Sequence, residues 1–348
     1  GAGSPPAFET ISTSDTLSFR NKIINGAMQV SQRGTKTGVQ SSYGGADRFG
    51  VWSDSDGRVT MSIANTGDDQ GFLRCQKLDC TTVASSGSYA YLGYRFEGQD
   101  LQQLKKGTAN AESVTLSFWV YSPKTGTHVI QLYDNDNTRH ICQAYTVSSA
   151  NTWEKKTLTF AGDTSGPLGN DASYSLQIYW WLFASSTYTS GTLATSWASF
   201  TAANAAVGQV NVLDDLANDF LITGVQFEAG DTATDFEHRS YGEELQRCLR
   251  YYEQSESLAN ATTEAWWFYA YSTAELWGSN MYNVKKRATP TVTTYDNSGS
   301  SGGAHKLGNP NHTVTASIFN NSRINKLAGS GLTAGGQYIC AYTVDAEL

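Results

Sequence analysis

Residues 114–121 read VTLSFWVY, with apolar side chains at every second position. An alternation with a period of two is typical of a strand that buries one face in a core. Residues 59–63 (VTMSI), 92–96 (LGYRF) and 176–183 (LQIYWWLF) show the same pattern. Stretches rich in Gly, Ser, Asn and Asp separate these segments and supply turns. The chain is therefore predicted to be all-β, an antiparallel sandwich or barrel of many short strands.

The composition indicates an ordered protein without a nucleic-acid partner. Aromatic residues make up 12% of the 348 residues, which excludes a disordered chain. The 24 basic and 32 acidic residues give a net charge of −8, whereas non-specific nucleic-acid binding needs a basic surface. No apolar run approaches the ~18 residues of a membrane span, so no membrane insertion is expected. The five cysteines are odd in number and lack a CxxC motif, so we interpret them as mostly buried thiols.

A break in the alternation predicts a local irregularity near residue 224. Phe220 and Ile222 share one parity, whereas Val225 and Phe227 share the other. Gly224 lies at the shift, which predicts a β-bulge.

Helical signals are few. Residues 100–106 (DLQQLKK) are predicted to form a short helix that starts at its Asp and ends before Gly107. Residues 240–252 are predicted to form another, with Leu245 and Leu249 on one face. The Ala/Ser/Thr-rich stretch 184–212 is weakly patterned. It is expected to be a long excursion that carries function or covers a surface.

The composition and patterning of the sequence change after about residue 250. Five aromatic residues crowd into residues 266–271, and a Gly/Ser-rich loop follows at residues 297–303. Short strands are predicted around residues 289–293, 314–319 and 338–344. We infer a second, smaller β domain.

Four aromatic residues are candidates for binding glycan: Trp119, Tyr121, Tyr179 and Trp181. Each has the parity opposite to that of the simplest core assignment. An outward aromatic side chain presents a flat face that stacks on a sugar ring, and neighbouring polar residues supply hydrogen bonds. Burial between subunits is the alternative, because Trp and Tyr are favoured at interfaces.

Asp134 and Asp136 are weak candidates for a structural Ca²⁺ site, because residues 134–137 read DNDN. Arg139 and Tyr145 stand where a calcium loop needs its Gly and its Glu. An Asx-rich hairpin turn is the alternative.

No catalytic residue is assigned, and the chain is expected not to be an enzyme. The sequence has no G-x-S-x-G, no HExxH and no Cys/His cluster. Glu228, Asp231 and Asp235 are the acids that a glycan depolymerase would use, since glycoside hydrolysis needs two carboxylates. Solvated turn acids are the simpler interpretation of these residues.

Two stretches resemble a family of bacteriophage tail-fibre and virion appendage proteins. The first is residues 21–34 (NKIINGAMQVSQRG), followed by ADRF at residues 46–49. The second is residues 224–253 (GVQFEAGDTATDFEHRSYGEELQRCLRYYE). Further marks of the resemblance are RATPTV at residues 287–292 and YTVDAEL at residues 342–348. We interpret residues 224–253 as a structural junction rather than a binding site.

The resemblance implies a carbohydrate-binding-module-like jelly-roll β-sandwich over residues 21–240 and a small β domain over residues 241–348. Residues 1–20 would then be a tether or a remnant of cloning. It also implies a homotrimer in the virion, in a tail fibre or other surface appendage among other virion proteins. We expect non-catalytic receptor binding to host cell-surface glycan during adsorption. The alternatives are a purely structural fibre connector or capsid decoration protein and, third, a glycan depolymerase.

Overall fold

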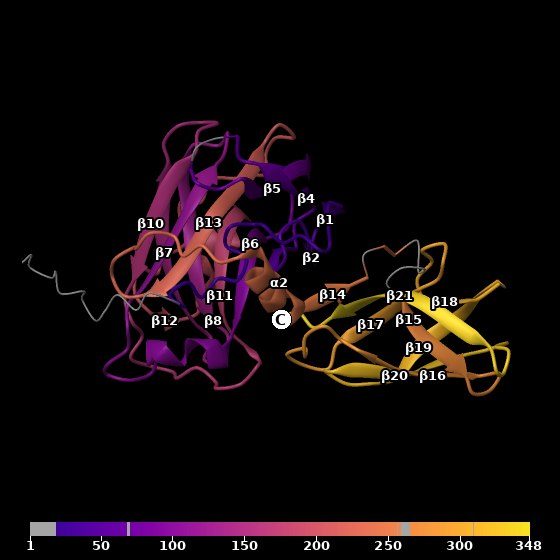
Figure 1. The fold of residues 1–348 in the computed structure, drawn as a ribbon. Helices are drawn as coiled ribbons and strands as arrows, with labels where there is room; N and C mark the ends of the chain where they lie inside the picture. Colours follow the sequence, from indigo (N-terminus) through magenta and orange to yellow (C-terminus); the bar gives the residue numbers. More distant parts are fainter. Residues whose placement is uncertain (1–18, 68–69, 256, 259–264, 309) are drawn as a thin grey trace, which may run out of the picture.

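Two β domains joined by a short helix make up the chain (Figure 1). The computed structural model describes residues 19–67, 70–255, 257–258, 265–308 and 310–348. Regular structure in these residues is mainly antiparallel β-strand, which confirms the predicted all-β fold. Residues 1–18, most of the expected tether, lie outside the described part. Among the described helices, none is long and apolar enough to cross a membrane.

The larger domain is a sandwich of two antiparallel sheets with jelly-roll connections. The first sheet has the order β1 (Lys36–Val39), β4 (Arg58–Asn65), β5 (Arg74–Thr82), β13 (Asp219–Ala229), β7 (Val114–Tyr121), β10 (Glu154–Phe160). The second has the order β12 (Ala198–Ser199), β9 (Arg139–Val147), β8 (Gly126–Asp134), β11 (Tyr174–Ala184), β6 (Tyr89–Glu97), β3 (Phe49–Ser53), β2 (Ser42–Tyr43).

The core between the sheets follows the predicted parity. Val114, Leu116, Phe118 and Val120 of β7 are all buried. The ring of Phe118 meets Trp180 of β11 edge-on, with 5.9 Å between ring centroids. One set of alternate residues on each strand therefore fills the sandwich, and the other set faces outward.

The bulge predicted at Gly224 is present. The pairing of β13 with β7 shifts register between Thr223 and Gln226, and Gly224 has φ +59°. A Cβ at this position would lie 2.6 Å from the ring of Phe72. Gly224 is therefore needed both for its backbone conformation and for the close packing of that ring.

Both predicted helices exist, with corrections. The first is a 3₁₀ helix, η1 (Gly98–Leu104), which ends at Lys105 in the left-handed conformation rather than before Gly107. The second is α2 (Tyr241–Leu249), whose N-cap Ser240 accepts a hydrogen bond from the Glu243 N–H. Its fully buried residues are Glu244 and Cys248. The predicted Leu245/Leu249 face is only half-buried.

The smaller domain is a sheet that closes on itself. Its strands follow the order β14 (Tyr252–Gln254), β21 (Gln337–Asp345), β15 (Trp266–Ala270), β16 (Glu275–Met281), β20 (Arg323–Gly329), β19 (Asn311–Phe319), β18 (Gly303–Lys306), with β17 (Thr291–Tyr295) also paired to β21. The pairing of β18 with β21 completes the ring. Trp266 and Phe268 of β15 point into its core, whereas Trp267 and Tyr269 are more than half exposed.

Ion pairs join the two domains beside α2, where the C-terminus also lies (Figure 1). Arg48, which is 1% exposed, pairs with Glu347, and its guanidinium lies 3.4 Å from the ring centroid of Tyr251. Arg33 binds both Asp345, at 3.0 Å, and Glu347, at 3.1 Å. Residues 345–347 are thereby held by the segments that precede β1 and β3 of the sandwich.

Arg239 holds the corner between the sandwich and α2. It donates to the main-chain oxygens of Asn21 and Ile23 and pairs with Glu237 and Glu244. These contacts join the two stretches that carry the family resemblance. They agree with the interpretation of residues 224–253 as a structural junction.

Candidate functional site

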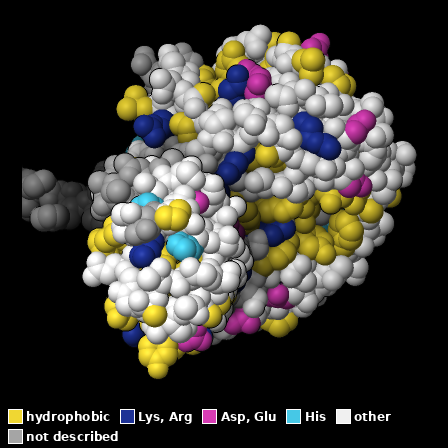
Figure 2. Space-filling model, turned by 90° about the vertical axis from the view of Figure 1, so that its right-hand side faces the viewer, with side chains coloured by type: hydrophobic (Ala, Val, Ile, Leu, Met, Phe, Trp, Pro, Cys, Tyr) yellow, Lys and Arg dark blue, Asp and Glu magenta, His cyan; other side chains and the backbone are white. Residues whose placement is uncertain are grey.

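A groove of about 280 Å³ lies on the outer face of the seven-stranded sheet. Hydrophobic side chains gather in a hollow of the larger domain, next to the smaller domain that stands in front (Figure 2). We call the site the tyrosine groove. Its lining is Tyr89, Tyr91, Arg95, Gln131, Tyr133, Asn135, Tyr174, Gln177, Tyr179, Trp181, Tyr188 and Phe200.

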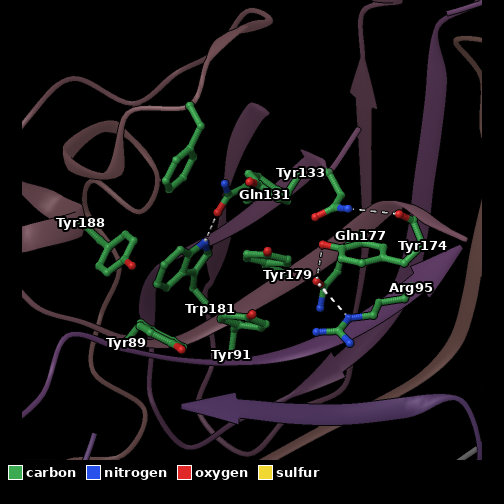
Figure 3. A pocket seen from close by; sticks show the side chains of 12 residues that line it. Tyr89, Tyr91, Arg95, Gln131, Tyr133, Tyr174, Gln177, Tyr179, Trp181 and Tyr188 are labelled. Atoms are coloured by element: carbon green, nitrogen blue, oxygen red, sulfur yellow. Dashed lines mark hydrogen bonds between the residues drawn. The ribbon is translucent and has the colours of Figure 1, made fainter. Parts of the chain in front are cut away.

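Four tyrosine rings cross the floor of the tyrosine groove (Figure 3). Tyr91 of β6 and Tyr179 of β11 stack face to face, with 3.9 Å between ring centroids and 4° between planes. Tyr89 extends the row at 5.6 Å from Tyr91, and Tyr133 of β8 extends it at 5.9 Å from Tyr179. The row arises because the outward residues of neighbouring antiparallel strands lie side by side.

The phenols of Tyr91 and Tyr179, at the centre of this row, are neutral. Burial raises the pKa of Tyr91 to about 12 and raises that of Tyr179 well above its ordinary value. A neutral phenol both donates and accepts hydrogen bonds. The row therefore offers apolar ring edges together with hydroxyl groups that both donate and accept.

Trp181 forms the deep end of the groove and is fixed by a polar chain. Its indole Nε1 donates to Gln131 Oε1 at 3.2 Å, and Gln131 Nε2 lies 3.3 Å from His140 Nδ1. Because an indole nitrogen only donates, Gln131 presents its amide N–H to His140, which accepts at Nδ1. Burial lowers the pKa of His140 to about 4, which matches this accepting role.

Arg95 and Gln177 form the other end of the groove. The Arg95 guanidinium lies 4.2 Å from the ring centroid of Trp52 and 4.8 Å from that of Tyr174. Its Nε donates to Gln177 Oε1 at 3.3 Å, and another guanidinium nitrogen donates to the main-chain oxygen of Leu348. This end of the groove therefore touches the smaller domain's final residues.

One wall of the groove comes from the weakly patterned stretch 184–212. This stretch contains α1 (Ser186–Thr189), β12 and η2 (Ala202–Asn204). Tyr188 packs on Trp181 with ring centroids 5.1 Å apart, and Phe200 meets Tyr133 edge-on at 5.4 Å. The excursion covers part of the sheet's outer face, as predicted, and its edge turns a flat surface into a groove.

The four aromatic candidates separate into two pairs. Tyr179 and Trp181 line the tyrosine groove. Trp119 and Tyr121 lie on β7 in the opposite sheet. Trp119 lines a different pocket there, and Tyr121 packs against Trp153 with ring centroids 5.6 Å apart.

The sequence analysis did not single out the rest of the groove. Tyr91 and Arg95 have the outward parity of β6, opposite to Leu92 and Phe96, and this signal was present in the sequence. Tyr188 and Phe200 had no such signal. They lie in residues 184–212, where no repeat of apolar residues indicates how the chain folds.

Asp134 and Asp136 do not favour calcium. The buried Asp134 carboxylate binds the ammonium of Lys106 at 2.5 Å and accepts from the Asn137 amide at 2.9 Å. Asp136 accepts from the Gly169 N–H at 2.8 Å. The ammonium group of Lys106 therefore supplies the positive charge at this turn, in the place where a Ca²⁺ ion was considered. Within the described ranges, no group of three or more His, Cys, Asp or Glu could hold a metal ion.

The three acids considered for hydrolysis lie away from the groove, at the end of β13 and in the corner that follows it. Glu228 is 3% exposed and accepts from the Thr234 N–H at 2.9 Å and the Thr234 hydroxyl at 2.7 Å. Asp231 and Asp235 are exposed. Glu228 thus fixes the corner.

Fold and groove define a class: a two-domain all-β protein whose jelly-roll sandwich carries an open aromatic groove. No family model matches the sequence, and no curated protein matches it.

Solved structures with some likeness include tailspike protein 4 of bacteriophage CBA120, in its enzymatically active domain. It is 15% identical with a TM-score of 0.34, and the match covers 60% of this chain and 21% of that chain. A CBM4 chain is 13% identical with a TM-score of 0.31, covering 59% and 97%. The CBM22-2 xylan-binding domain from Paenibacillus barcinonensis Xyn10C is 14% identical with a TM-score of 0.29, covering 52% and 91%.

Proposed function

We propose that this chain is a non-catalytic bacteriophage virion protein, in a tail fibre or other surface appendage, that binds host cell-surface glycan during adsorption. The observation that carries the binding role is the tyrosine groove. It is open and lined by aromatic rings with a few convergent polar groups, which is the usual composition of a ligand site.

Each part of the groove suits a saccharide. The stacked rings of Tyr91 and Tyr179 offer apolar edges for the C–H groups of a sugar, and their neutral phenols offer hydrogen bonds to hydroxyl groups. Asn135 adds an exposed amide at the rim. A chain of sugars is the kind of ligand that needs both properties repeated along one surface.

Binding without catalysis is favoured by the charges of the groove. Among the described residues that line it, none is acidic, whereas glycoside hydrolysis uses paired carboxylates. The virion assignment rests on the resemblance of residues 21–34 and 224–253 to tail-fibre and appendage proteins. A homotrimer that bears three such grooves would multiply a weak single-site affinity through avidity.

The test is a glycan array of bacterial envelope polysaccharides probed with wild type, Tyr179→Ala and Trp119→Ala. Tyr179→Ala removes the centre of the ring row and is expected to weaken binding at least about tenfold. Trp119→Ala is the matched control, because it removes an aromatic side chain from the opposite sheet. Thermal unfolding of all three proteins verifies the fold, and light scattering gives the oligomeric state.

Other outcomes favour the alternatives. Loss of binding in Trp119→Ala but not in Tyr179→Ala would move the site to the opposite sheet. Release of new reducing ends from a bound polysaccharide would indicate a depolymerase. Failure of the folded protein to bind any envelope glycan would overturn the proposed function in favour of a structural connector or decoration protein.

A further inference from the structure

A second pocket of about 280 Å³ lies on the outer face of the six-stranded sheet, across the sandwich from the tyrosine groove. We call it the bulge pocket, because its lining includes the bulged Gly224 together with Phe72, Trp119 and Asp235. We propose that it binds a small zwitterionic group, with the ammonium centre against Trp119 and the anionic centre near Lys155. The two sites share none of their described lining residues, so this inference goes beyond the proposed function and does not depend on it.

The bulge in β13 opens the floor of this pocket. Trp119 has the outward parity of β7, and Gly224 lies beside it without a side chain. A Cβ at position 224 would lie 2.6 Å from the ring of Phe72 and 3.1 Å from that of Trp119. Both rings therefore reach the space above the bulge, and the glycine leaves that space open.

Trp119 offers an unused aromatic surface. Its ring is half-buried, and among the described residues no aromatic ring stacks on it and no cation lies over it. The neighbouring rings of the pocket are already packed on one another, with 4.8 Å between the centroids of Phe72 and Phe236 and 5.4 Å between those of Phe72 and His238. Trp attracts cations more strongly than any other aromatic side chain. Its free ring is therefore suited to an ammonium group.

Asp235 supplies a negative charge at the same pocket. It is exposed, and its main-chain oxygen accepts from Arg20 and Gln226. Its carboxylate has no hydrogen bond or ion pair within the described part of the chain. A free carboxylate and an open indole ring in one pocket both favour the same kind of group, a cation.

Lys155 and Ser117 form a different part of the lining. Lys155 of β10 is exposed and lies directly opposite Trp119 in the pairing of β10 with β7. Ser117 is only 4% exposed, yet its hydroxyl has no partner among the residues that the structure describes. An ammonium point charge and a free hydroxyl donor suit phosphate or carboxylate.

The order of the strands separates the two charges. Lys155 lies on β10, on one side of β7, whereas Asp235 follows β13, on the other side. In the described structure Lys155 and Asp235 form no ion pair with each other. A ligand with a single charge would match only one of these groups, whereas a zwitterion matches both. The volume is at the small end of the range for ligand pockets, which favours a compact group over a chain of sugars.

The experiment is calorimetric titration of the full chain with phosphocholine, choline and inorganic phosphate. Wild type is expected to bind phosphocholine at least about tenfold more tightly than either half of that molecule. Equal affinity for phosphocholine and choline would show that the anionic centre is not recognised, and would overturn the inference. Failure of the folded protein to bind phosphocholine would overturn it as well.

Variants assign the two ends of the ligand. Trp119→Ala and Asp235→Asn are each expected to weaken choline and phosphocholine alike, by about fivefold or more, because both remove attraction for the ammonium centre. Lys155→Gln is expected to weaken phosphocholine but not choline. Asp231→Asn is the matched control, because it removes an exposed carboxylate from the same corner but not from the lining.

Phosphocholine binding that is unchanged in both Trp119→Ala and Asp235→Asn would place the ligand elsewhere and overturn the inference. The comparison of the three ligands needs no variant, so it holds even if a variant fails to fold.

Phosphocholine can be presented by a lipid or by a saccharide, and two further probes separate these sources. Vesicles of phosphatidylcholine test the lipid headgroup, and dextran conjugated with phosphocholine tests the saccharide substituent. Binding to either supports the inference and identifies the source. Glycans without a zwitterionic substituent are expected to bind Trp119→Ala as they bind wild type. Failure of this inference therefore leaves the proposed function intact.

Discussion

His128 and His140 are buried in the sandwich, and their titration couples stability to pH. Both are 0% exposed, and burial lowers the pKa of each to about 4 from an ordinary value of 6.5. Between these values the unfolded chain binds more protons than the folded chain. The free energy of unfolding must therefore decrease as the pH falls from about 6.5 towards 4.

We expect each of these histidines to cost about 1–2 kcal/mol of unfolding free energy between pH 7 and pH 5. Most carboxylates stay ionised in this range, so the histidines dominate the slope. Urea denaturation followed by tryptophan fluorescence at several pH values measures it. His128→Asn should flatten the slope. An unchanged slope in His128→Asn would contradict the assignment.

Single residues of the groove show where sequence reasoning succeeds and where it stops. The parity of β11 placed Tyr179 and Trp181 on an outer face, and the same argument placed Trp119 and Tyr121 of β7 on the other outer face. The parity of residues along a strand does not show which of the two outer faces of the sandwich carries a groove. That choice depends on the folding of residues 184–212 against one sheet.

At the scale of elements, the bulge in β13 controls how the strand passes from one register to the next. Gly224→Ala would combine an unfavourable φ of +59° with a Cβ 2.6 Å from the Phe72 ring. We expect a loss of about 2–3 kcal/mol in unfolding free energy, measured by urea denaturation. Gly34→Ala is the control, because Gly34 has φ +61° with no atom within 4 Å of the added Cβ.

The Gly34 variant should lose only about 1 kcal/mol, the cost of the backbone conformation alone. Equal losses in the two variants would mean that the Phe72 ring yields to the new methyl group. The close packing at Gly224 would then be unimportant for stability.

The sequence analysis predicted strands from alternating apolar residues and from turn residues, and it missed structural detail that leaves no such pattern. Strands β7, β11, β17, β19 and β21 all fall where alternation or turn residues indicated them. The end of the first helix was misplaced, because Lys105 adopts a left-handed conformation and ends the helix two residues before Gly107. The buried face of α2 was also missed. It is set by Glu244 and Cys248 docking on the sandwich rather than by its leucines.

At the scale of the whole molecule, the junction between the domains depends on one fully buried cation. Arg48 pairs with Glu347 and lies between the rings of Tyr94 and Tyr251. Arg48→Met would leave the Glu347 carboxylate with Arg33 alone, and the domains would separate more easily. We expect a loss of about 3–5 kcal/mol in unfolding free energy.

Denaturation and limited proteolysis measure this loss, with cleavage expected between the domains before either unfolds. The double variant Arg48→Met/Glu347→Gln should recover part of it, because the buried Glu347 charge is then removed while Arg33 keeps its pair with Asp345. A single variant as stable as wild type, with an uncleaved junction, would show that the buried ion pair does not hold the domains together.

The position of Glu347 also has a consequence for synthesis on the ribosome. Domains fold as units, N-terminal first, as the chain emerges. The parts of the sandwich that carry Arg33, Arg48 and Arg95 are synthesised long before their partners Glu347 and Leu348 leave the exit tunnel. The nascent sandwich therefore lacks the contacts of Arg33, Arg48 and Arg95 with Glu347 and Leu348 until these two residues have emerged. The Arg95 end of the tyrosine groove acquires its final shape only at that stage.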